Sequence, residues 1–202
     1  GVAKSPLDWD YTTATLWETN VVASTKPLSL LEAGDTDNNL EVYTLPEWSR
    51  TNRELIENAP TERPTLRITF ESKDPNPVFF LRRYIKDDIS GRPERLAAGR
   101  KLCLRVKKMP EGLKAGCITS DGYTYLAPCT AATDDIIRIP LTELRQTNTA
   151  LLPHAYPVFL DNYFRPQTEI PFQVEKIESL ELSFEGTAGK QAEIEIGGIW
   201  LE

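Results

Sequence analysis

The sequence predicts an all-β fold, an antiparallel β-sandwich with one or two short peripheral helices. From residue 64 onward, apolar and polar side chains alternate with a period of two, and these runs end at Pro, Gly, Asn or Asp. Asp121-Gly122 also offers the positive φ that a tight hairpin turn needs. Seven or eight strands with one apolar face each can bury those faces only in a sandwich or a barrel, and we expect the sandwich.

The first part of the chain, residues 1–63, is the least regular. Short strands are expected at 12–22, 27–32 and 40–45. The segment 48–59 is expected to form a short helix that Pro60 ends.

Beyond residue 64, the apolar parity predicts which side chains of each strand point into the core. The expected inward rows are Leu66/Ile68/Phe70, Phe79/Leu81/Ile85, Leu102/Leu104/Val106, Ile137/Ile139/Leu141, Leu180/Leu182/Phe184 and Ile194/Ile196. A hairpin is expected over 112–126, a long loop over 142–173 and a turn over 186–189.

Length and composition predict a single globular domain over residues 1–202, with regular strands over 64–202. A chain that is 40% hydrophobic and 26% charged has enough apolar side chains to exclude disorder. No apolar run approaches the roughly 20 residues that a membrane span needs. The net charge of -7 disfavours nucleic acid as a general partner.

The three cysteines are Cys103, Cys117 and Cys129, and none lies in a CxxC motif or beside the single histidine. We interpret them as structural residues. Cys117 and Cys129 flank the expected hairpin, so a disulfide between them and three free thiols both stay open.

The end of the chain resembles a known family. The series Ile139-Pro140-Leu141, a long loop, residues 174–184 and the closing stretch 193–201 is similar to the end of galactose-binding-like jelly rolls. These domains occur as carbohydrate-binding modules and as ancillary domains of bacterial glycoside hydrolases and polysaccharide lyases. Many of them close with two acidic residues where this chain has Gly197-Gly198, so no metal or ligand role is carried over to that position.

The resemblance implies a jelly-roll domain that is secreted, periplasmic or on the cell surface. Its expected partners are an oligo- or polysaccharide and, in the same polysaccharide-processing protein, a catalytic domain. The similarity covers the last third of the chain in detail and residues 64–202 in strand pattern.

A row of arginines is the first candidate site. The outward positions include Arg67, Arg82, Arg105 and Arg138, joined by Phe80, Tyr84 and Lys107. Guanidinium forks bind carboxylates and aromatic rings stack on sugars, so one face carrying these residues would suit an acidic glycan. Alternatively, the arginines form ordinary surface ion pairs with Glu181, Glu185, Glu193 and Glu195 on neighbouring strands.

The loop rim is the second candidate, because galactose-binding-like domains often hold their ligands there. Its expected ligand-binding residues are Tyr123, Tyr125, His154 and Tyr156, whose side chains combine an apolar body with a polar tip. The alternative is a loop stiffened by proline whose aromatic side chains, Phe159 and Phe164 among them, complete the core.

No catalytic residue is assigned. His154 is the only histidine, and no GxSxG motif or catalytic-cysteine context accompanies it. Glu193 and Glu195 are separated by about 6.5 Å along a strand, which suits a glycosidase pair but also any solvent-facing strand.

The turn that carries Asp35, Asp37 and Asn39 is the one expected metal site. These oxygens alternate as in calcium loops, although Gly is missing at the sixth position and Pro46 stands where the bidentate Glu belongs. The pattern predicts either a structural calcium or a solvated Asx turn, and no other cofactor is expected.

The leading hypothesis is a non-catalytic carbohydrate-binding or ancillary module, with an acidic glycan as one candidate ligand. The first alternative is a small jelly-roll glycoside hydrolase or polysaccharide lyase. The second is a structural domain that packs on a catalytic partner.

Overall fold

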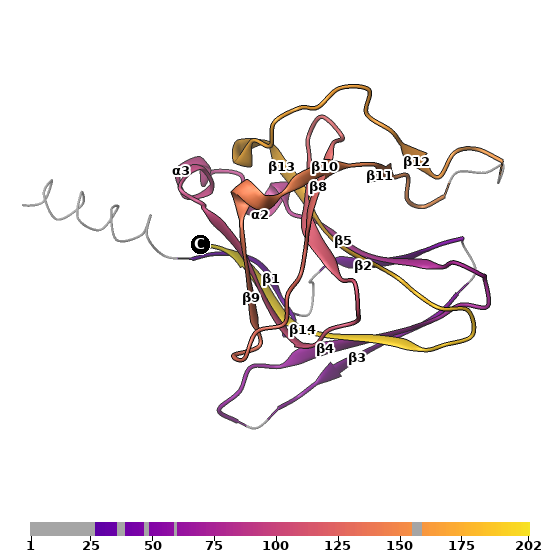
Figure 1. The fold of residues 1–202 in the computed structure, drawn as a ribbon. Coiled ribbons are helices and arrows are strands. Elements are labelled where there is room, and N and C mark those ends of the chain that lie inside the picture. The colour runs from indigo at the N-terminus through magenta and orange to yellow at the C-terminus, as the bar shows by residue number, and fades with distance from the viewer. Residues whose placement is uncertain (1–26, 36–38, 47–48, 59, 155–158) are drawn as a thin grey trace, which may run out of the picture.

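The computed structural model describes residues 27–35, 39–46, 49–58, 60–154 and 159–202. Two six-stranded antiparallel sheets form the framework of this part of the chain (Figure 1). The expected strand at 12–22 lies outside the described residues. No helix among the described residues is long and apolar enough to cross a lipid bilayer.

The first sheet is built around β14, the last strand. Its strands in spatial order are β3 (Arg50–Ile56), β4 (Thr65–Glu71), β14 (Ala192–Leu201), β6 (Lys101–Lys108) and β9 (Ile136–Pro140), with β1 (Leu28–Glu32) also on β14. Strand β4 pairs with the first half of β14 and β1 with the second half. The register of β14 against β6 shifts on either side of Ile196, which marks a β-bulge.

The second sheet is built around β13 in the same way. Its strands in spatial order are β10 (Arg145–Thr147), β8 (Thr124–Pro128), β7 (Lys114–Thr119), β13 (Ile177–Glu185), β5 (Val78–Tyr84) and β2 (Leu40–Leu45). The expected hairpin is confirmed as β7 and β8, with Gly122 at a φ of 87° in its turn.

The alternation of side chains is confirmed. Leu81 and Ile137 are 1% and 4% exposed and belong to the core, whereas Arg82 is half-buried and Arg138 is exposed on the outer faces of their sheets. A stretch with a period of two places its apolar side chains on one face of a strand, and stacking the two sheets removes that face from water.

Three phenylalanines join the two sheets at the centre of the core. Phe70 comes from β4 in the first sheet, and Phe79 and Phe184 come from β5 and β13 in the second. The ring centroids of Phe70 and Phe79 are 4.8 Å apart, and each lies 5.4 Å from that of Phe184. Aromatic pairs at such distances contribute stability beyond the area that they bury.

A small two-stranded element lies against the outer side of the second sheet. It consists of β11 (Thr149–Ala150) and β12 (Tyr163–Phe164), and we call it the flap (Figure 1). Leu45, Phe80 and Ala150 form a second buried cluster beneath it. The segment expected as one long loop therefore contains short strands of its own.

The predicted helix over 48–59 is wrong. Strand β3 occupies this segment and pairs along its whole length with β4, from Arg50 opposite Glu71 to Ile56 opposite Thr65. Most of β3 is exposed, so its local pattern carries little strand signal, and backbone pairing with β4 decides its conformation. The described short α-helices are α2 (Lys86–Ile89) and α3 (Pro93–Ala97), and Pro93 begins the second.

The three cysteines are free thiols in the structure. Burial raises the pKa of Cys117 and of Cys129 to about 12. Burial and then the neighbouring Glu202 carboxylate raise the pKa of Cys103 to about 12. Thiolates are the reactive form, so all three side chains should be inert near neutral pH.

We therefore expect the folded protein to show almost no reaction with a thiol reagent at pH 8. After unfolding without a reductant, all three cysteines should react. Ellman's assay in buffer and in guanidinium chloride measures the number of reactive thiols in the folded and in the unfolded protein. A single reactive thiol in the unfolded chain would instead show that two of the three cysteines form a disulfide.

Candidate functional site

A groove crosses the outer side of the second sheet next to the flap. Its volume is about 570 Å³, and it is lined by side chains of β5, β13, β7 and β8 and by the flap. Half-buried Val78 and Leu126 contribute apolar surface, and Tyr163 of β12 stands at the edge of the flap. The groove therefore places the Tyr163 side chain beside a surface formed by the strands of the second sheet.

A buried ion pair supports the floor of this groove. The Arg82 Nε donates to Glu181 Oε1 at 3.1 Å, and its Nη2 donates to the same oxygen and to the Ala150 carbonyl oxygen, the latter at 3.0 Å. Glu181 is 1% exposed, and burial keeps its pKa above the ordinary range although Arg82 acts in the opposite direction. Arg82 therefore ties the flap to the sheet while it neutralises Glu181.

The remaining charged groups around the groove are mainly acidic. Glu111 and Glu185 line it on exposed positions, and Lys114 is the basic side chain among its lining residues. Ser183 and Asn148 add uncharged hydrogen-bonding groups. Such a surface offers acceptors to hydroxyl groups and repels a negatively charged ligand.

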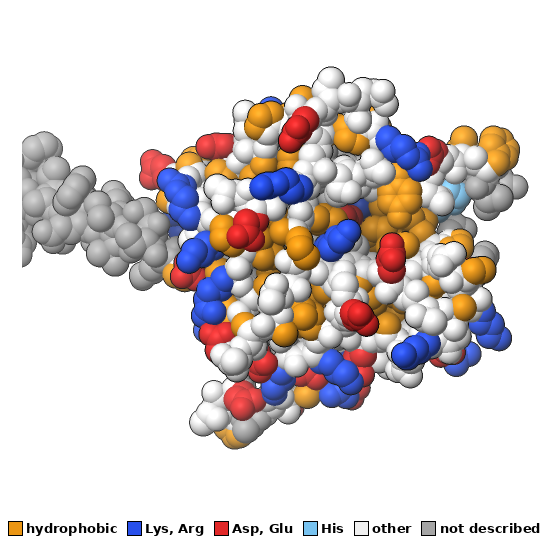
Figure 2. All heavy atoms as spheres, in the orientation of Figure 1, with side chains coloured by type: hydrophobic (Ala, Val, Ile, Leu, Met, Phe, Trp, Pro, Cys, Tyr) orange, Lys and Arg blue, Asp and Glu red, His pale blue; other side chains and the backbone are white. Residues whose placement is uncertain are grey.

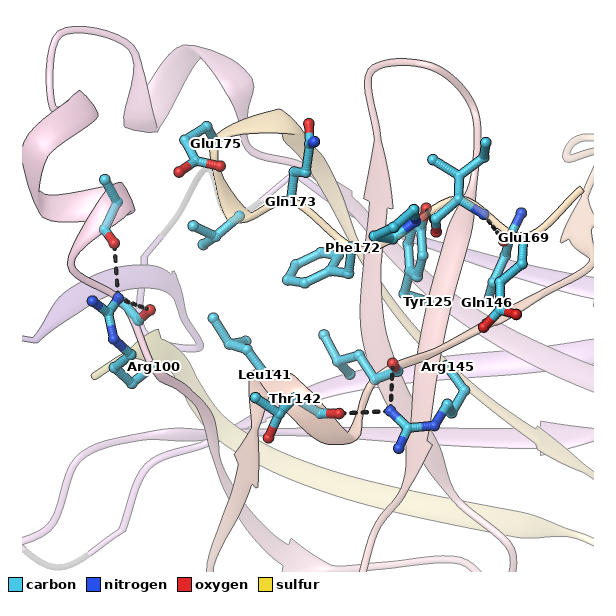
Figure 3. A pocket seen from close by; sticks show the side chains of 16 residues that line it. Arg100, Tyr125, Leu141, Thr142, Arg145, Gln146, Glu169, Phe172, Gln173 and Glu175 are labelled. Atoms are coloured by element: carbon cyan, nitrogen blue, oxygen red, sulfur yellow. Dashed lines mark hydrogen bonds between the residues drawn. The ribbon is translucent and has the colours of Figure 1, made fainter.

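A larger hollow, the end pocket, opens at one end of the sandwich (Figure 3). Its volume is about 650 Å³. It lies between the end of α3, the η1 turn (Leu141–Glu143) with β10, and the segment 169–175 that leads into η2 (Val174–Lys176). Phe172, Leu141 and Leu144 give it an apolar floor, with the buried Tyr125 beneath.

The segment that closes the end pocket is fixed by hydrogen bonds. Tyr125 Oη donates to the Ile170 carbonyl oxygen at 2.7 Å. The Gln146 side chain accepts from the Ile170 N–H at 2.7 Å and donates to the Thr168 carbonyl oxygen at 3.2 Å. The Tyr125 and Phe172 rings pack with their centroids 5.2 Å apart. The pocket wall is therefore preformed.

One solved structure shares this architecture over most of the chain. It is the family 11 carbohydrate-binding module from Clostridium thermocellum in complex with a β-1,3-1,4-mixed-linked tetrasaccharide. The match has a TM-score of 0.56 and 11% sequence identity, and it covers 87% of this chain and 95% of that chain. The chain has a jelly-roll β-sandwich fold. No protein-family model matches the sequence, and no curated protein matches it significantly.

The jelly roll confirms the fold that the resemblance implied. At 11% identity the match speaks for the fold alone, and the ligand in the solved complex belongs to that protein. The site of the present chain rests on its own side chains.

The structure separates the arginines that were expected on one face. Arg82 lies on the second sheet with Phe80 and Tyr84. The others, together with Lys107, lie on the outer side of the first sheet: Arg67, Arg105 and Arg138. The single basic face is thereby corrected, because β5 belongs to the second sheet whereas β4, β6 and β9 belong to the first.

Ion pairs occupy three of these four arginines, and those of Arg67 and Arg82 use glutamates that the alternative interpretation named. Arg67 Nε lies 2.9 Å from Glu193 Oε1, and its Nη2 lies 3.1 Å from Glu195 Oε1. Arg138 Nη2 lies 2.9 Å from Asp134 Oδ2. Glu193 and Glu195 thus flank a shared arginine and form no free carboxylate pair.

Arg105 and the exposed Tyr84 lie apart from both hollows. The Arg105 guanidinium carbon is 5.4 Å from the centre of the Trp200 ring, a cation–π contact on the first sheet. Tyr84, 47% exposed, ends β5 and is absent from the lining of the groove. Their ligand-binding roles stay predictions.

The expected rim residues do not form one cluster. Tyr125 is 2% exposed and belongs to the core beneath the end pocket, because its strand parity turns it inward. Tyr123 is half-buried with its ring 6.1 Å from that of Phe164, and His154 lies beside Leu152 and Tyr43 near the other end of the flap. Tyr156 lies outside the described residues.

The expected calcium site is only partly described. Asp37 lies outside the described residues, and Asn39 has a φ of 50°, as in a turn. Within the described ranges, no three His, Cys, Asp or Glu side chains are grouped to hold a metal ion. The calcium site therefore stays a prediction.

Among the residues that line the two hollows, sequence reasoning had named only Phe80 and Tyr125 as candidate site residues. Glu181 was expected only as a surface ion-pair partner, and Tyr163 lies in the segment 142–173 that was expected as a long loop. Alternation indicates that Glu181 faces outward, but it does not encode strand order. Glu181 lies opposite Arg82 because β13 and β5 are neighbours, which the sequence pattern could not predict.

Proposed function

We propose that this domain binds a neutral oligosaccharide in the groove of the second sheet and does not cleave it. The observation that carries the proposal is the groove itself, about 570 Å³ in volume, with aromatic, aliphatic and uncharged polar side chains on a rigid sheet. Volumes of about 300–1,000 Å³ are typical of small-molecule sites. The similarity to a carbohydrate-binding module supports the same ligand class.

Tyr163 supplies the aromatic surface of the groove. Tyr163 is half-buried and packs against the cluster of Leu45, Phe80 and Ala150, so it is held in place, and it also lines the groove. Phe80 is 3% exposed and acts as its support. Sugar rings have apolar C–H faces that pack on such a ring, and their hydroxyl groups hydrogen-bond to polar neighbours.

The charges favour a neutral glycan over an acidic one. Arg82 is neutralised by Glu181, and the exposed lining groups are Glu111, Glu185 and Lys114. A uronate in the groove would meet more carboxylates than cations. Figure 2 also shows acidic and basic side chains interspersed over the visible face, without a continuous basic patch.

Two of the three carboxylates of the groove are poorly placed to act as a pair in glycoside hydrolysis. Glu181 and Glu185 are on one face of β13 but four residues apart, which corresponds to about 13 Å along a strand. Hydrolysis by paired carboxylates needs about 5–9.5 Å. We therefore expect binding without release of reducing ends or unsaturated sugars, in the setting of a secreted, periplasmic or cell-surface protein with a catalytic domain as partner.

Tyr163→Ala should weaken binding of the preferred neutral oligosaccharide by about tenfold or more, because the stacking surface is lost. A neutral glycan array identifies the ligand, and isothermal titration calorimetry measures the affinities. Tyr163→Phe keeps the ring and should bind nearly as the unmodified protein does.

The matched control is Phe159→Ala, which removes an aromatic side chain that is 82% exposed and absent from the lining of the groove. It should leave the affinity unchanged. Unchanged binding by Tyr163→Ala, or release of reducing sugars by the unmodified domain, would overturn the proposal.

A further inference from the structure

We propose that the end pocket is a second binding site, separate from the groove, which takes the carboxylate of a hexuronate residue in an acidic glycan. The proposal rests on two arginines of its rim, on its apolar floor and on the polar wall opposite. It does not depend on the groove or on the ligand that the groove binds.

Arg100 and Arg145 belong to the same wall of the pocket. In Figure 3 they lie on either side of Leu141 and Thr142. Neither forms an ion pair with any residue that the structure describes. In this respect they differ from Arg67, Arg82 and Arg138, and their charges remain available to a ligand.

Main-chain carbonyl groups hold both guanidinium groups in place. Arg145 Nη1 donates to the carbonyl oxygens of Thr142 at 2.6 Å and Leu144 at 3.2 Å. Arg100 Nη1 donates to those of Ala97 and Gly99, both at 2.9 Å. In each arginine, Nη1 donates these hydrogen bonds, and the edge formed by Nε and Nη2 remains free. This edge can bind a carboxylate with two parallel hydrogen bonds.

This arrangement is preorganised. A free arginine loses side-chain entropy when it binds an anion, whereas a guanidinium already held by two carbonyl groups loses less. The carbonyl oxygens also add negative potential behind the guanidinium without neutralising it. Arg145 and Arg100 are exposed, so an incoming carboxylate reaches them without any rearrangement of the fold.

The rest of the pocket suits a sugar ring. Phe172 and Leu141 provide an apolar surface between the walls, and Gln173 and Glu175 stand on the side opposite Arg100 and Arg145 in Figure 3. An amide and a carboxylate accept hydrogen bonds from hydroxyl groups. A hexuronate carries a carboxylate on one side of its ring and hydroxyl groups around the remainder. The carboxylate would face the two arginines, and the hydroxyl groups would face Gln173 and Glu175.

The C-terminal carboxylate of a peptide is the other ligand with the same charged group. It would use the arginine forks but has few hydroxyl groups for Glu175 and Gln173. We therefore favour the glycan, and a peptide is included as a competing outcome of the test.

The experiment is a titration of the ¹⁵N-labelled domain with trigalacturonate, followed by backbone amide chemical shifts. Three further probes are compared: the methyl-esterified trigalacturonate, which keeps the rings and removes the charge, trialanine with a free carboxylate, and its C-terminal amide. We expect trigalacturonate to shift amides of β10 and of residues 169–175. The methyl ester should bind at least about tenfold more weakly.

Arg145→Gln and Arg100→Gln should each weaken trigalacturonate binding by about tenfold, and Arg145→Lys should restore only part of it because lysine has no fork. Arg138→Gln removes an exposed, ion-paired arginine of the first sheet and is the matched control. Its affinity should equal that of the unmodified domain. Thermal unfolding checks that each variant is folded.

Equal binding of the acid and its methyl ester, shifts that map to the groove, tighter binding of trialanine, or no binding of trigalacturonate would each overturn the proposal. Tyr163→Ala separates it from the proposed function, since that variant should lose the neutral oligosaccharide and keep trigalacturonate. Conversely, Arg145→Gln should keep the neutral ligand.

Discussion

Arg82→Gln is expected to lower the free energy of unfolding by about 3–5 kcal/mol at neutral pH. The variant leaves the Glu181 carboxylate, 2% exposed as a side chain, buried without its ion-pair partner. It also removes the hydrogen bond from Arg82 to the Ala150 carbonyl oxygen that ties down the flap. Chemical denaturation followed by tryptophan fluorescence measures the loss.

The loss should depend on pH in a defined direction. Burial already holds the pKa of Glu181 above its ordinary value of 4.5, and removing Arg82 raises it further. A carboxyl group whose pKa is higher in the folded state takes up a proton on folding, so stability falls as the pH rises from the unfolded-state pKa through the folded-state pKa. The variant should therefore lose little stability near pH 4 and most at neutral pH.

Two further variants test the cause. Arg138→Gln breaks an exposed ion pair and should cost less than about 1 kcal/mol. Arg82→Met combined with Glu181→Leu removes both charges and should recover much of the stability, because no buried charge is left unpaired. A loss in Arg82→Gln that is independent of pH would contradict the role assigned to Glu181.

Phe79→Ala should lower the free energy of unfolding by about 3–5 kcal/mol, the usual cost of deleting a fully buried phenylalanine ring. Phe79 is 0% exposed and its ring contacts both Phe70 and Phe184, so the cavity would open between the two sheets. The midpoint of thermal or denaturant unfolding records the change.

Phe159→Ala is the control for this prediction. Phe159 is 82% exposed in the segment between the flap strands, so its truncation should leave the packing of the core unchanged. Its unfolding midpoint should match that of the unmodified protein. Equal stability of Phe79→Ala and Phe159→Ala would refute the central position of the phenylalanine cluster.

The strands of the sandwich could be predicted because each one repeats a local pattern. Leu180, Leu182 and Phe184 alternate with polar residues, and this spacing is sufficient to define a strand with one buried face. Strand β3 could not be predicted, because its exposed residues show no such alternation. Its conformation depends on pairing with β4, whose first residue follows Ile56 by nine positions.

The candidate sites were less accessible to sequence reasoning. Alternation places Arg82 and Arg138 on outer faces but gives no information on which sheet each strand joins, so the two arginines were placed on one face. Tyr125 was expected at the rim, although the parity of its strand turns it into the core. Arg145 and Arg100 could not be predicted as site residues, because neither belongs to a stretch of alternating apolar and polar residues.

The sequence by itself determined the fold class and the inward rows of six strands, β4, β5, β6, β9, β13 and β14, because a period of two needs only neighbouring residues. Tertiary structure alone decided which strands are neighbours, and so which charges meet. The pairing of Glu181 with Arg82 joins residues almost a hundred positions apart, and the end pocket combines α3, η1 and the segment 169–175. Such contacts arise from the packing of whole sheets, and no local pattern of side chains specifies them.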